Sequence, residues 1–206
     1  MIEIYLIRHG YTDYNKNGIV QGSGIDSDIN EEGAEQARKF YSFYKHLEFD
    51  GIYASTLKRT AQTLAPWLEK DTPHFHHEGL NEFNWGEYEG KKPREEDRAA
   101  YRSIVESWQS GDWDVGAKGG ETPNVAWRRA EGFFHQLFSN HMDQKLLVCS
   151  HGRQIRIMLH KLTGIDMEDA SIYPHKNTGL SILKIKDDFT AVSEKLNDAT
   201  HLMVPV

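Results

Sequence analysis

The sequence holds a single cysteine, Cys149, among its 206 residues. One thiol excludes an intramolecular disulfide framework, and a free cysteine is ordinary for a protein of a reducing compartment. Long apolar runs are missing too, because Glu3 interrupts the apolar N-terminus and Arg8 ends it, and no run approaches the roughly 18 residues that a membrane span needs. We therefore expect a cytoplasmic protein without an export signal or a membrane anchor.

Positive charge is also scarce, since 24 lysines and arginines stand against 31 acidic residues, a formal net charge of -7. Such a balance argues against nonspecific binding to nucleic acid or to an anionic membrane surface, so any anion site must be local. Internal repeats and low-complexity tracts are absent from the sequence. With 38% hydrophobic residues, the chain can bury a core as one domain spanning residues 1–206.

Short apolar runs alternate with helical patterns along the chain. Three of these runs predict strands buried on both faces, and they lie at 2–7, 50–55 and 145–150. The amphipathic helical patterns that follow them lie at 30–47, 56–70 and 151–164. Two later runs, 179–185 and 189–196, are typical of a hairpin. The alternation predicts an α/β protein, a three-layer α/β/α sandwich whose mostly parallel central sheet has an antiparallel edge strand.

Local signals mark several helix ends. Asn30 suits the N-cap of the first helix, because acidic residues follow it in the first turn, where the helix dipole favours them. Pro66 should kink or shorten the second helix, and Gly164 suits a C-cap for the third. Thr122 and Pro123 supply an N-cap and a first-turn proline for a further helix that runs to about Ser139.

The composition changes between about 83 and 125, where the chain is charged, aromatic and rich in glycine. One weak helical pattern lies at 94–108. We interpret 83–125 as a small lid-like insertion within the domain. Its aromatic residues could line a substrate mouth or form the core of the lid, and they are Trp85, Tyr88, Trp108 and Trp113.

Polar side chains follow each of the three predicted strands. These residues are Arg8, His9 and Gly10, then Ser55 and Arg59, and finally Ser150, His151 and Gly152. Because ligands of open parallel sheets bind outside the carboxyl ends of the strands, two histidines and two arginines should meet at one edge. Arginine forks match the oxygens of a tetrahedral dianion, and imidazole can attack phosphorus or donate a hydrogen bond. The cluster therefore favours phosphoryl chemistry.

Other residues would complete such a site. Gly152 opens a helix whose unpaired amides attract negative charge, and Asn15 and Gln21 offer neutral donors. The leaving group of a phosphoester also needs an acid. Glu82 lies in a stretch, "LNEFNWGEYEG", that is apolar enough to raise the pKa of a carboxyl group, while Glu87 and Glu89 are rivals on spacing alone.

Together these segments resemble the histidine phosphatase superfamily, in the branch of cofactor-dependent phosphoglycerate mutases and broad-specificity phosphatases. The segments are "LIRHGYTDYN", "ASTLKRTAQT", "LNEFNWGEYEG", "GGETPNVAWRR" and "VCSHGRQIR", and the resemblance continues through "NTGLSIL" and "LNDATHL". The resemblance implies the α/β/α sandwich and makes His9 the nucleophile, which forms a phosphohistidine. It makes Glu82 the proton donor that later activates water, and it assigns phosphoryl binding to Arg8, Arg59 and His151.

The resemblance also implies a surrounding phosphate-binding set, formed by Asn15, Gln21, Gly152 and, in the turn "GGETP", Glu121. Neither a metal nor another cofactor is expected, because cationic side chains do here what Mg²⁺ does in other phosphoryl-transfer enzymes. The expected partner is a small phosphorylated metabolite. The sequence leaves open whether the protein forms a homodimer. The chain departs from the family at Tyr11, where a glutamate is frequent, and at "DSDIN", where Asp-x-Pro-Leu-Thr is common.

Three functions stay open at this point. A phosphoglycerate mutase must keep water away from its phosphoenzyme while the intermediate reorients. Because mutases of this branch have a longer insertion and tail, and this chain has little after His201, we favour a phosphomonoesterase. A weakly catalytic module that binds phosphorylated ligands is the third alternative.

Other motifs have simpler interpretations. A cysteine phosphatase needs an arginine six residues after its thiolate, and Ile155 stands there, so Cys149 is expected to be a small buried hydrophobic residue. The histidines of 74–78 could bind a metal, although no further ligand is recognisable nearby. The segment 91–98 is a solvated face of mixed charge or a surface that attracts an anionic substrate.

Overall fold

The computed structural model describes residues 1–69, 71–140, 143–169 and 172–204. Within these residues one sheet has six strands in the order β3-β2-β4-β1-β5-β6. The strands are β1 (Ile2–Arg8), β2 (Gly51–Ala54), β3 (His74–His76), β4 (Lys145–Ser150), β5 (Leu180–Ile185) and β6 (Ala191–Asp198). The first four run parallel, whereas β5 pairs antiparallel with β1 and β6 antiparallel with β5. The predicted mostly parallel sheet with an antiparallel edge is confirmed.

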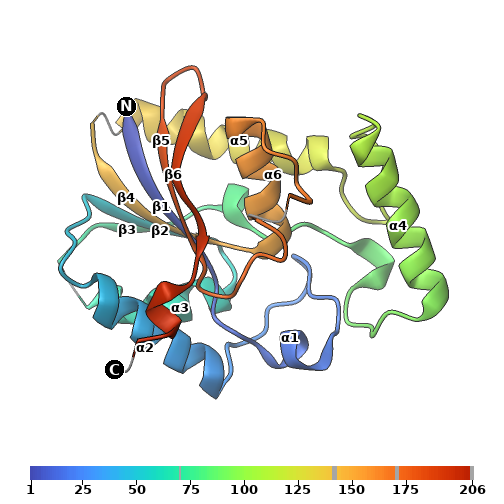
Figure 1. Ribbon diagram of the computed structural model, residues 1–206, viewed down its shortest axis with the longest axis horizontal. Helices are drawn as coiled ribbons and strands as arrows, with labels where there is room; N and C mark the ends of the chain where they lie inside the picture. The colour runs from blue at the N-terminus through green and yellow to red at the C-terminus, as the bar shows by residue number, and fades with distance from the viewer. Residues whose placement is uncertain (70, 141–142, 170–171, 205–206) are drawn as a thin grey trace.

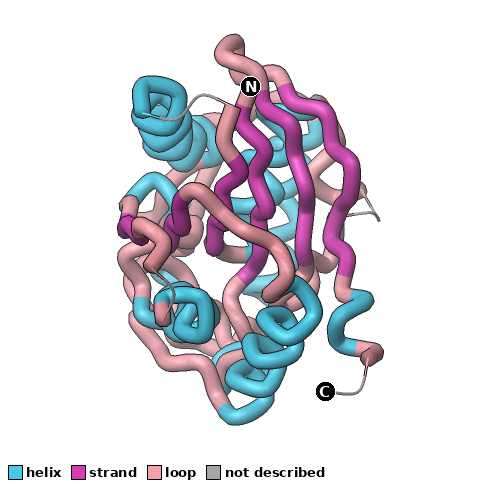
Figure 2. The backbone as a smooth tube through the Cα atoms, turned by 90° about the vertical axis from the view of Figure 1, so that its left-hand side faces the viewer, coloured by secondary structure: helices cyan, strands magenta, loops and turns pink. Residues whose placement is uncertain are grey.

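Helices cover both faces of the sheet (Figures 1 and 2). The α-helices are α1 (Asp13–Asn17), α2 (Glu31–Tyr44), α3 (Lys58–Leu68), α4 (Glu95–Gln109), α5 (Pro123–Asn140) and α6 (Gly152–Thr163), of which α5 and α6 cover one face and α2 and α3 the other. On one face, Ile4 and Val148 pack against α5 and α6. On the other, Ile7 and Leu147 pack against Phe40 of α2 and other side chains of α2 and α3. Alternate residues of the same strands thus pack into two hydrophobic cores, one on each face of the sheet. The sheet and the two helical layers form the three-layer sandwich.

Most predicted helix ends agree with the structure. The side chain of Asn30 caps α2 by accepting a hydrogen bond from Gly33 N at 3.0 Å. Gly164, at a φ of 76°, ends α6 in the left-handed conformation that glycine adopts without steric cost. Pro66 lies inside α3, which ends at Leu68. The predicted segment extended to residue 70, which lies outside the described residues.

Strand β3 was not predicted. Its three residues are all exposed, and they pair only with β2 at the edge of the sheet, so they show neither an apolar run nor alternation. The histidines of 74–78 therefore begin in an edge strand. Among the described residues, no group of three or more His, Cys, Asp or Glu side chains could hold a metal ion.

The segment between 83 and 125 has a small core of its own. In that core, Phe83, Trp85 and Trp108 pack against Ile157 of α6 and further apolar residues. Helix α4 lies apart from the sheet, at the right of Figure 1. Trp113 stacks on the His160 ring of α6, with 4.4 Å between the ring centroids. Trp108 and Trp113 thus belong to the interior of this segment, which is anchored to α6.

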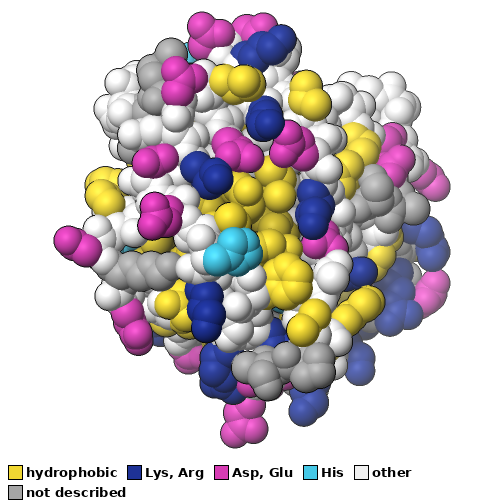
Figure 3. Space-filling view, turned by 60° about the vertical axis from the view of Figure 1, so that its left-hand side comes forward, with side chains coloured by type: hydrophobic (Ala, Val, Ile, Leu, Met, Phe, Trp, Pro, Cys, Tyr) yellow, Lys and Arg dark blue, Asp and Glu magenta, His cyan; other side chains and the backbone are white. Residues whose placement is uncertain are grey.

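The surface carries both signs of charge. Figure 3 shows one face of the molecule, on which apolar side chains gather in a hollow and basic and acidic side chains alternate around it. No helix of the described chain is long and apolar enough to span a bilayer.

Candidate active site

The polar residues that follow the strands meet at one edge of the sheet. Strands β1 and β4 pair in parallel with Arg8 opposite Ser150, and His9 N donates to Ser150 O at 3.0 Å. The rings of His9 and His151 consequently lie 5.1 Å apart between centroids. Parallel pairing thus joins two segments that are about 140 positions apart in the sequence.

The ring of His9 has a defined tautomer. Its Nδ1 lies 2.8 Å from Gly10 O, and since a carbonyl only accepts, Nδ1 carries the proton and Nε2 keeps its lone pair. Burial lowers the pKa of His9 well below its ordinary value, and the charges of Arg59 and Arg8 lower it further. His9 is therefore a neutral imidazole with an available nucleophilic nitrogen.

Gly10 is required where β1 leaves the sheet. A Cβ atom at this position would lie 2.7 Å from Gly33 O in the first turn of α2, which is closer than real Cβ contacts allow. The amide of Gly10 donates to Thr63 Oγ1 of α3 at 2.8 Å. The backbone after His9 is thus fixed against two helices.

Two arginines bring positive charge to the histidines, Arg59 fully buried and Arg8 half-buried. Arg59 donates from Nε to His151 Nδ1 at 3.1 Å and from Nη1 to Ile25 O at 2.6 Å. Burial lowers the pKa of Arg59 to about 10, so it stays charged at neutral pH. Arg8 donates from Nη1 to the carbonyl of His175, while its Nε is buried without a hydrogen-bond partner. The unused donor of Arg8 suits an anionic ligand.

His151 is neutral as well, with the opposite tautomer. Because Arg59 can only donate, His151 Nδ1 accepts, and its Nε2 carries the proton toward Ser55 Oγ at 2.8 Å. Burial, followed by the charge of Arg59, holds the pKa of His151 well below its usual range. Both ring nitrogens are therefore engaged in the structure.

Glu82 lies at the N-terminal end of α6. Its Oε1 accepts hydrogen bonds from the amides of Phe83 at 2.8 Å and Gln154 at 3.0 Å, and its Oε2 accepts one from Arg153 at 3.4 Å. The amides fix the carboxyl group beside His9 at the wall of the pocket.

Of the three glutamates that spacing left open, only Glu82 lines the main pocket. Glu87 is exposed. Glu89 is held elsewhere, because its carboxylate accepts from the amides of Trp85 and Gly24, each at 2.9 Å.

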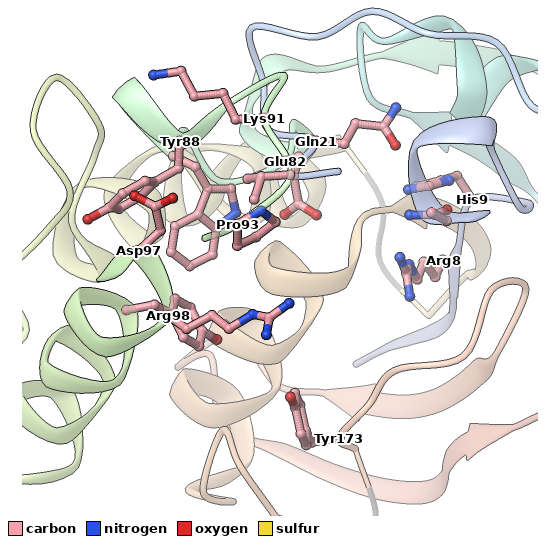
Figure 4. A pocket seen from close by; sticks show the side chains of 14 residues that line it. Arg8, His9, Gln21, Glu82, Tyr88, Lys91, Pro93, Asp97, Arg98 and Tyr173 are labelled. Atoms are coloured by element: carbon pink, nitrogen blue, oxygen red, sulfur yellow. The ribbon is translucent and has the colours of Figure 1, made fainter. Parts of the chain in front are cut away.

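A pocket of about 370 Å³ joins this edge of the sheet to the segment after Glu82. Figure 4 shows Arg8, His9 and Gln21 on one side and Tyr88 and other residues of the inserted segment on the other. The full lining is Arg8, His9, Asn15, Val20, Gln21, Glu82, Trp85, Tyr88, Lys91, Pro93, Asp97, Arg98, Tyr101 and Tyr173. The size and the partly apolar lining suit a small molecule with one polar end.

The neutral residues of the site are held by a network around α1. Thr12 caps α1, its Oγ1 donates to Gln21 Oε1 at 2.9 Å, and its amide donates to Asn15 Oδ1 at 3.3 Å. Asn177 Nδ2 contacts both His9 O at 2.9 Å and Asn15 Oδ1 at 3.2 Å. Asn177, in the segment "NTGLSIL", has no role that the sequence predicts, because only the fold brings its loop to His9.

Of the two remaining predicted phosphate-binding residues, Gly152 lies beside Arg8 and Glu121 lies away from the main pocket. A Cβ atom on Gly152 would lie 3.3 Å from Arg8 Nε, so glycine lets the start of α6 approach the guanidinium. Glu121 is not in the lining of the main pocket. It pairs with Arg129 at 2.8 Å and accepts from Asn84 N at 2.9 Å, which braces the loop after Glu82.

Cys149 does not belong to the reactive set. It lies in β4 within the core between the sheet and α2 and α3, and burial raises the pKa of its thiol well above the ordinary value. The interpretation of Cys149 as a buried hydrophobic residue agrees with this position, because nucleophilic cysteines need an accessible thiolate.

Comparisons with known proteins agree with this geometry. A model of the histidine phosphatase superfamily (branch 1) matches residues 4–198. The chain is 28% identical to phosphoserine phosphatase 1 of Hydrogenobacter thermophilus over 98% of this chain and 95% of that protein. It is 29% identical to the broad-specificity phosphatase YOR283W of Saccharomyces cerevisiae, over 98% of this chain and 88% of that protein. The solved structure of Bacillus stearothermophilus YhfR superposes with a TM-score of 0.83 at 22% identity, covering 98% and 100% of the two chains.

An α/β sandwich with paired histidines and arginines at the carboxyl edge of its sheet defines a class of phosphoryl-handling proteins. With the family match over nearly its whole length, this chain belongs to the histidine phosphatase superfamily, branch 1. The two relatives align with almost the entire chain, and both are named phosphatases. The protein is therefore a phosphatase, which is a hydrolase.

The buried histidines predict a loss of stability in mild acid. His9, His151, His175 and His201 are each at most 3% exposed, and burial is the main cause that lowers the pKa of each below the ordinary 6.5. Between pH 6.5 and the lower folded values, the unfolded chain takes up protons that the folded chain does not. The free energy of unfolding should therefore fall from pH 7 to pH 5.5, by about 1 kcal/mol for each histidine.

Urea unfolding at the two pH values measures this difference. The control variant His46→Ala, which removes an exposed histidine, should show the same pH dependence as the parent. Equal midpoints at pH 7 and pH 5.5 would contradict the burial of neutral imidazoles.

Proposed function

We propose that the protein is a metal-independent phosphomonoesterase that hydrolyses small phosphorylated metabolites through a phosphohistidine on His9, with Glu82 as general acid and base. The observation that carries this proposal is the contact of His9 Nδ1 with Gly10 O at 2.8 Å, from which we infer the tautomer of His9. With the proton of the His9 ring on Nδ1, the lone pair is on Nε2. His9 lines the same pocket as Arg8 and Glu82. A neutral, fixed imidazole beside buried cations is what nucleophilic attack on a phosphate dianion requires.

In the first step, Nε2 of His9 attacks phosphorus as the bond from phosphorus to the ester oxygen breaks. Protonated Glu82 gives its proton to the departing alkoxide, so that an alcohol leaves. We assign stabilisation of the charge on the phosphoryl oxygens to Arg8, whose Nε has no partner, and to Arg59 and His151, whose hydrogen bonds to Ile25 O and Ser55 Oγ would be exchanged for the phosphoryl oxygens. Asn15 and Gln21 line the same pocket as His9, Gly152 lies beside Arg8, and we assign all three to phosphate binding.

In the second step, the ionised Glu82 takes a proton from water as the water oxygen attacks phosphorus. The bond from phosphorus to Nε2 breaks, phosphate leaves, and His9 returns to its neutral form. Glu82 is protonated again and ready for the next ester, which is why one carboxyl group suffices for both steps.

The architecture of the pocket favours hydrolysis over transfer. Arg98, one of the lining residues, has a side chain that is 58% exposed, and Lys91 in the same lining is exposed as well. Water therefore reaches the outer part of the pocket, whereas a mutase needs a closed site around its phosphoenzyme. We propose that residues 83–125 act as a short lid that shapes the pocket without sealing it.

Incubation with 3-phosphoglycerate in the presence of EDTA distinguishes hydrolysis from transfer. We expect release of inorganic phosphate without formation of the 2-isomer, and an unchanged rate when EDTA is added. Isomerisation faster than phosphate release would identify a mutase, and a rate abolished by EDTA and restored by a divalent cation would refute metal independence. Tight binding of phosphate without turnover of any ester would favour a binding module instead.

A further inference from the structure

An arginine of α5 holds the loop that carries Glu82. Arg129 donates to the carbonyl oxygens of Glu78 at 3.2 Å, Gly79 at 3.1 Å and Glu82 at 3.1 Å. The described chain has a single 3-10 turn at Glu78–Leu80 (η1) and no helix or strand from residue 81 to 85. Because this stretch lacks the repeating hydrogen bonds of a helix or strand, its contacts with Arg129 set its path.

The same guanidinium also contacts the helix that binds the carboxyl group of Glu82. Its Nη2 donates to Gln154 Oε1 of α6 at 3.0 Å. Gln154 is buried, and its side-chain amide donates to Gly79 O at 3.2 Å and to Ala126 O at 3.3 Å. The backbone amide of Gln154 donates to Glu82 Oε1 at 3.0 Å. Arg129 therefore contacts Glu82 twice, directly at the backbone carbonyl and through Gln154 at the carboxyl group.

Glu121 fixes the plane of this guanidinium. Its two carboxylate oxygens accept from Arg129 Nε at 3.2 Å and from Arg129 Nη2 at 2.8 Å, in a bidentate pair. Oε1 of Glu121 also accepts from Asn84 N at 2.9 Å, and Glu121 N donates to Asn84 O at 3.0 Å. The side chains of Arg129 and Glu121 are 22% and 11% exposed, so salt and water screen their attraction less than at the open surface. The pair thus holds the chain on both sides of Glu82.

The two carboxyl oxygens of Glu82 have different partners. Oε1 accepts from Phe83 N at 2.8 Å and from Gln154 N at 3.0 Å, whereas the contact of Oε2 with Arg153 N is 3.4 Å long. The oxygen that bears the proton of a carboxylic acid is a poor acceptor, so the proton of Glu82 belongs on Oε2. A general acid must lie within about 2.6–3.2 Å of the atom that it protonates, so the orientation of this carboxyl group matters for its reaction.

We infer that Arg129, oriented by Glu121, is a positioning residue for Glu82. It holds the carboxyl group so that Oε2 gives its proton to the leaving group and later takes one from water. The inference rests on the proposed hydrolysis, in which Glu82 is the acid and the base. Neither Arg129 nor Glu121 is in the lining of the pocket that contains His9, so both act through Glu82 and not on the substrate.

The variant Arg129→Met tests this role through the leaving group. Hydrolysis of an alkyl ester, glycerol 3-phosphate, should slow roughly 10- to 100-fold, because a misplaced acid protonates the ester oxygen poorly. Inhibition by inorganic phosphate should stay within about threefold, because Arg8 and His9 are unchanged. The nitrophenolate burst from 4-nitrophenyl phosphate should keep its rate, and its amplitude counts the correctly folded sites. Arg128→Met removes the same charge from an exposed neighbour on α5 and should change none of these values.

A double-mutant cycle separates positioning of Glu82 from a general loss of structure. Once Glu82→Gln has removed the acid, Arg129→Met should slow hydrolysis of glycerol 3-phosphate by no more than about threefold further. Glu121→Gln, which turns an amide group toward the guanidinium, should show the same dependence on Glu82, and Glu87→Gln is its exposed control. Additive losses in the double variants, or equal losses on the alkyl ester and on the nitrophenolate burst, would show a structural role and overturn the inference. An unchanged rate in Arg129→Met would overturn it as well.

Hydrogen exchange of the Gln154 amide tests the contact without turnover. This amide lies in the first turn of α6, where amides have no partner within the helix, so its protection reports the contact with Glu82. Its exchange should become roughly tenfold faster or more in Arg129→Met and stay the same in Arg128→Met. Unchanged protection in Arg129→Met would refute the positioning role and, where esters are still hydrolysed, leave the proposed hydrolysis intact. Faster exchange in a protein whose parent hydrolyses no ester would support Arg129 as the residue that holds Glu82 and refute the hydrolysis.

Discussion

Replacement of His9 by alanine should reduce the turnover of every phosphoester by roughly 10⁴-fold or more, the effect seen when a covalent nucleophile is removed. The loss should be independent of the leaving group, because His9 attacks phosphorus in every ester. His151 lies nearby, but Arg59 and Ser55 occupy both of its ring nitrogens. Acid quenching of the parent enzyme during turnover of ³²P-labelled ester, followed by rapid isolation, measures the phosphoenzyme directly.

The expected phosphoenzyme is labile in acid and stable in base, as phosphohistidine is. It should be absent from His9→Ala and present in His46→Ala, in which an exposed histidine is removed instead. A phosphoenzyme of undiminished yield in His9→Ala would assign the nucleophile to another residue. Binding of inorganic phosphate to His9→Ala should persist, since the two arginines remain in place.

Replacement of Glu82 by glutamine should slow hydrolysis by roughly 10²- to 10⁴-fold for esters of alkyl alcohols, which need a proton as they leave. The effect on 4-nitrophenyl phosphate should be much smaller in the phosphorylation step, because nitrophenolate leaves without one. The glutamine side chain keeps an oxygen that can accept from the amides of Phe83 and Gln154, so its position should change little. Stopped-flow measurement of the nitrophenolate burst separates the first step from the second.

The phosphoenzyme of Glu82→Gln should also accumulate, because the base that activates water is lost. The matched control is Glu87→Gln, which makes the same chemical change on an exposed side chain of the same loop and should leave both steps unchanged. Unaltered hydrolysis of alkyl esters in Glu82→Gln would move the acid to another group. Asp97 is the remaining carboxylate in the lining of the main pocket and would be the next candidate.

Much of the fold follows from local patterns. The apolar runs before His9 and His151 predicted β1 and β4 because both strands are buried on both faces. Asn30 and Gly164 predicted helix ends through their own side-chain chemistry and backbone freedom. By contrast, β3 has no apolar pattern, because it adds only three exposed residues to the edge of the sheet.

In the candidate site, too, some features could be predicted from local sequence and others depend on contacts between distant residues. Spacing alone left Glu82, Glu87 and Glu89 as alternatives, and the structure separates them through contacts with distant residues. Gln154, whose amide holds Glu82, is 72 positions away. Glu121 was expected among the phosphate-binding residues, but in the fold it pairs with Arg129 beside that loop.

The secondary-structure alternation, the family resemblance and the types of residue that follow each strand could be predicted from the chain alone, because they depend on near neighbours. The nearness of His9 to His151 and the choice among three glutamates needed the folded structure. Hydrogen bonds and charge interactions act over a few ångströms. Which groups come within that range depends on how the sheet and its helices pack.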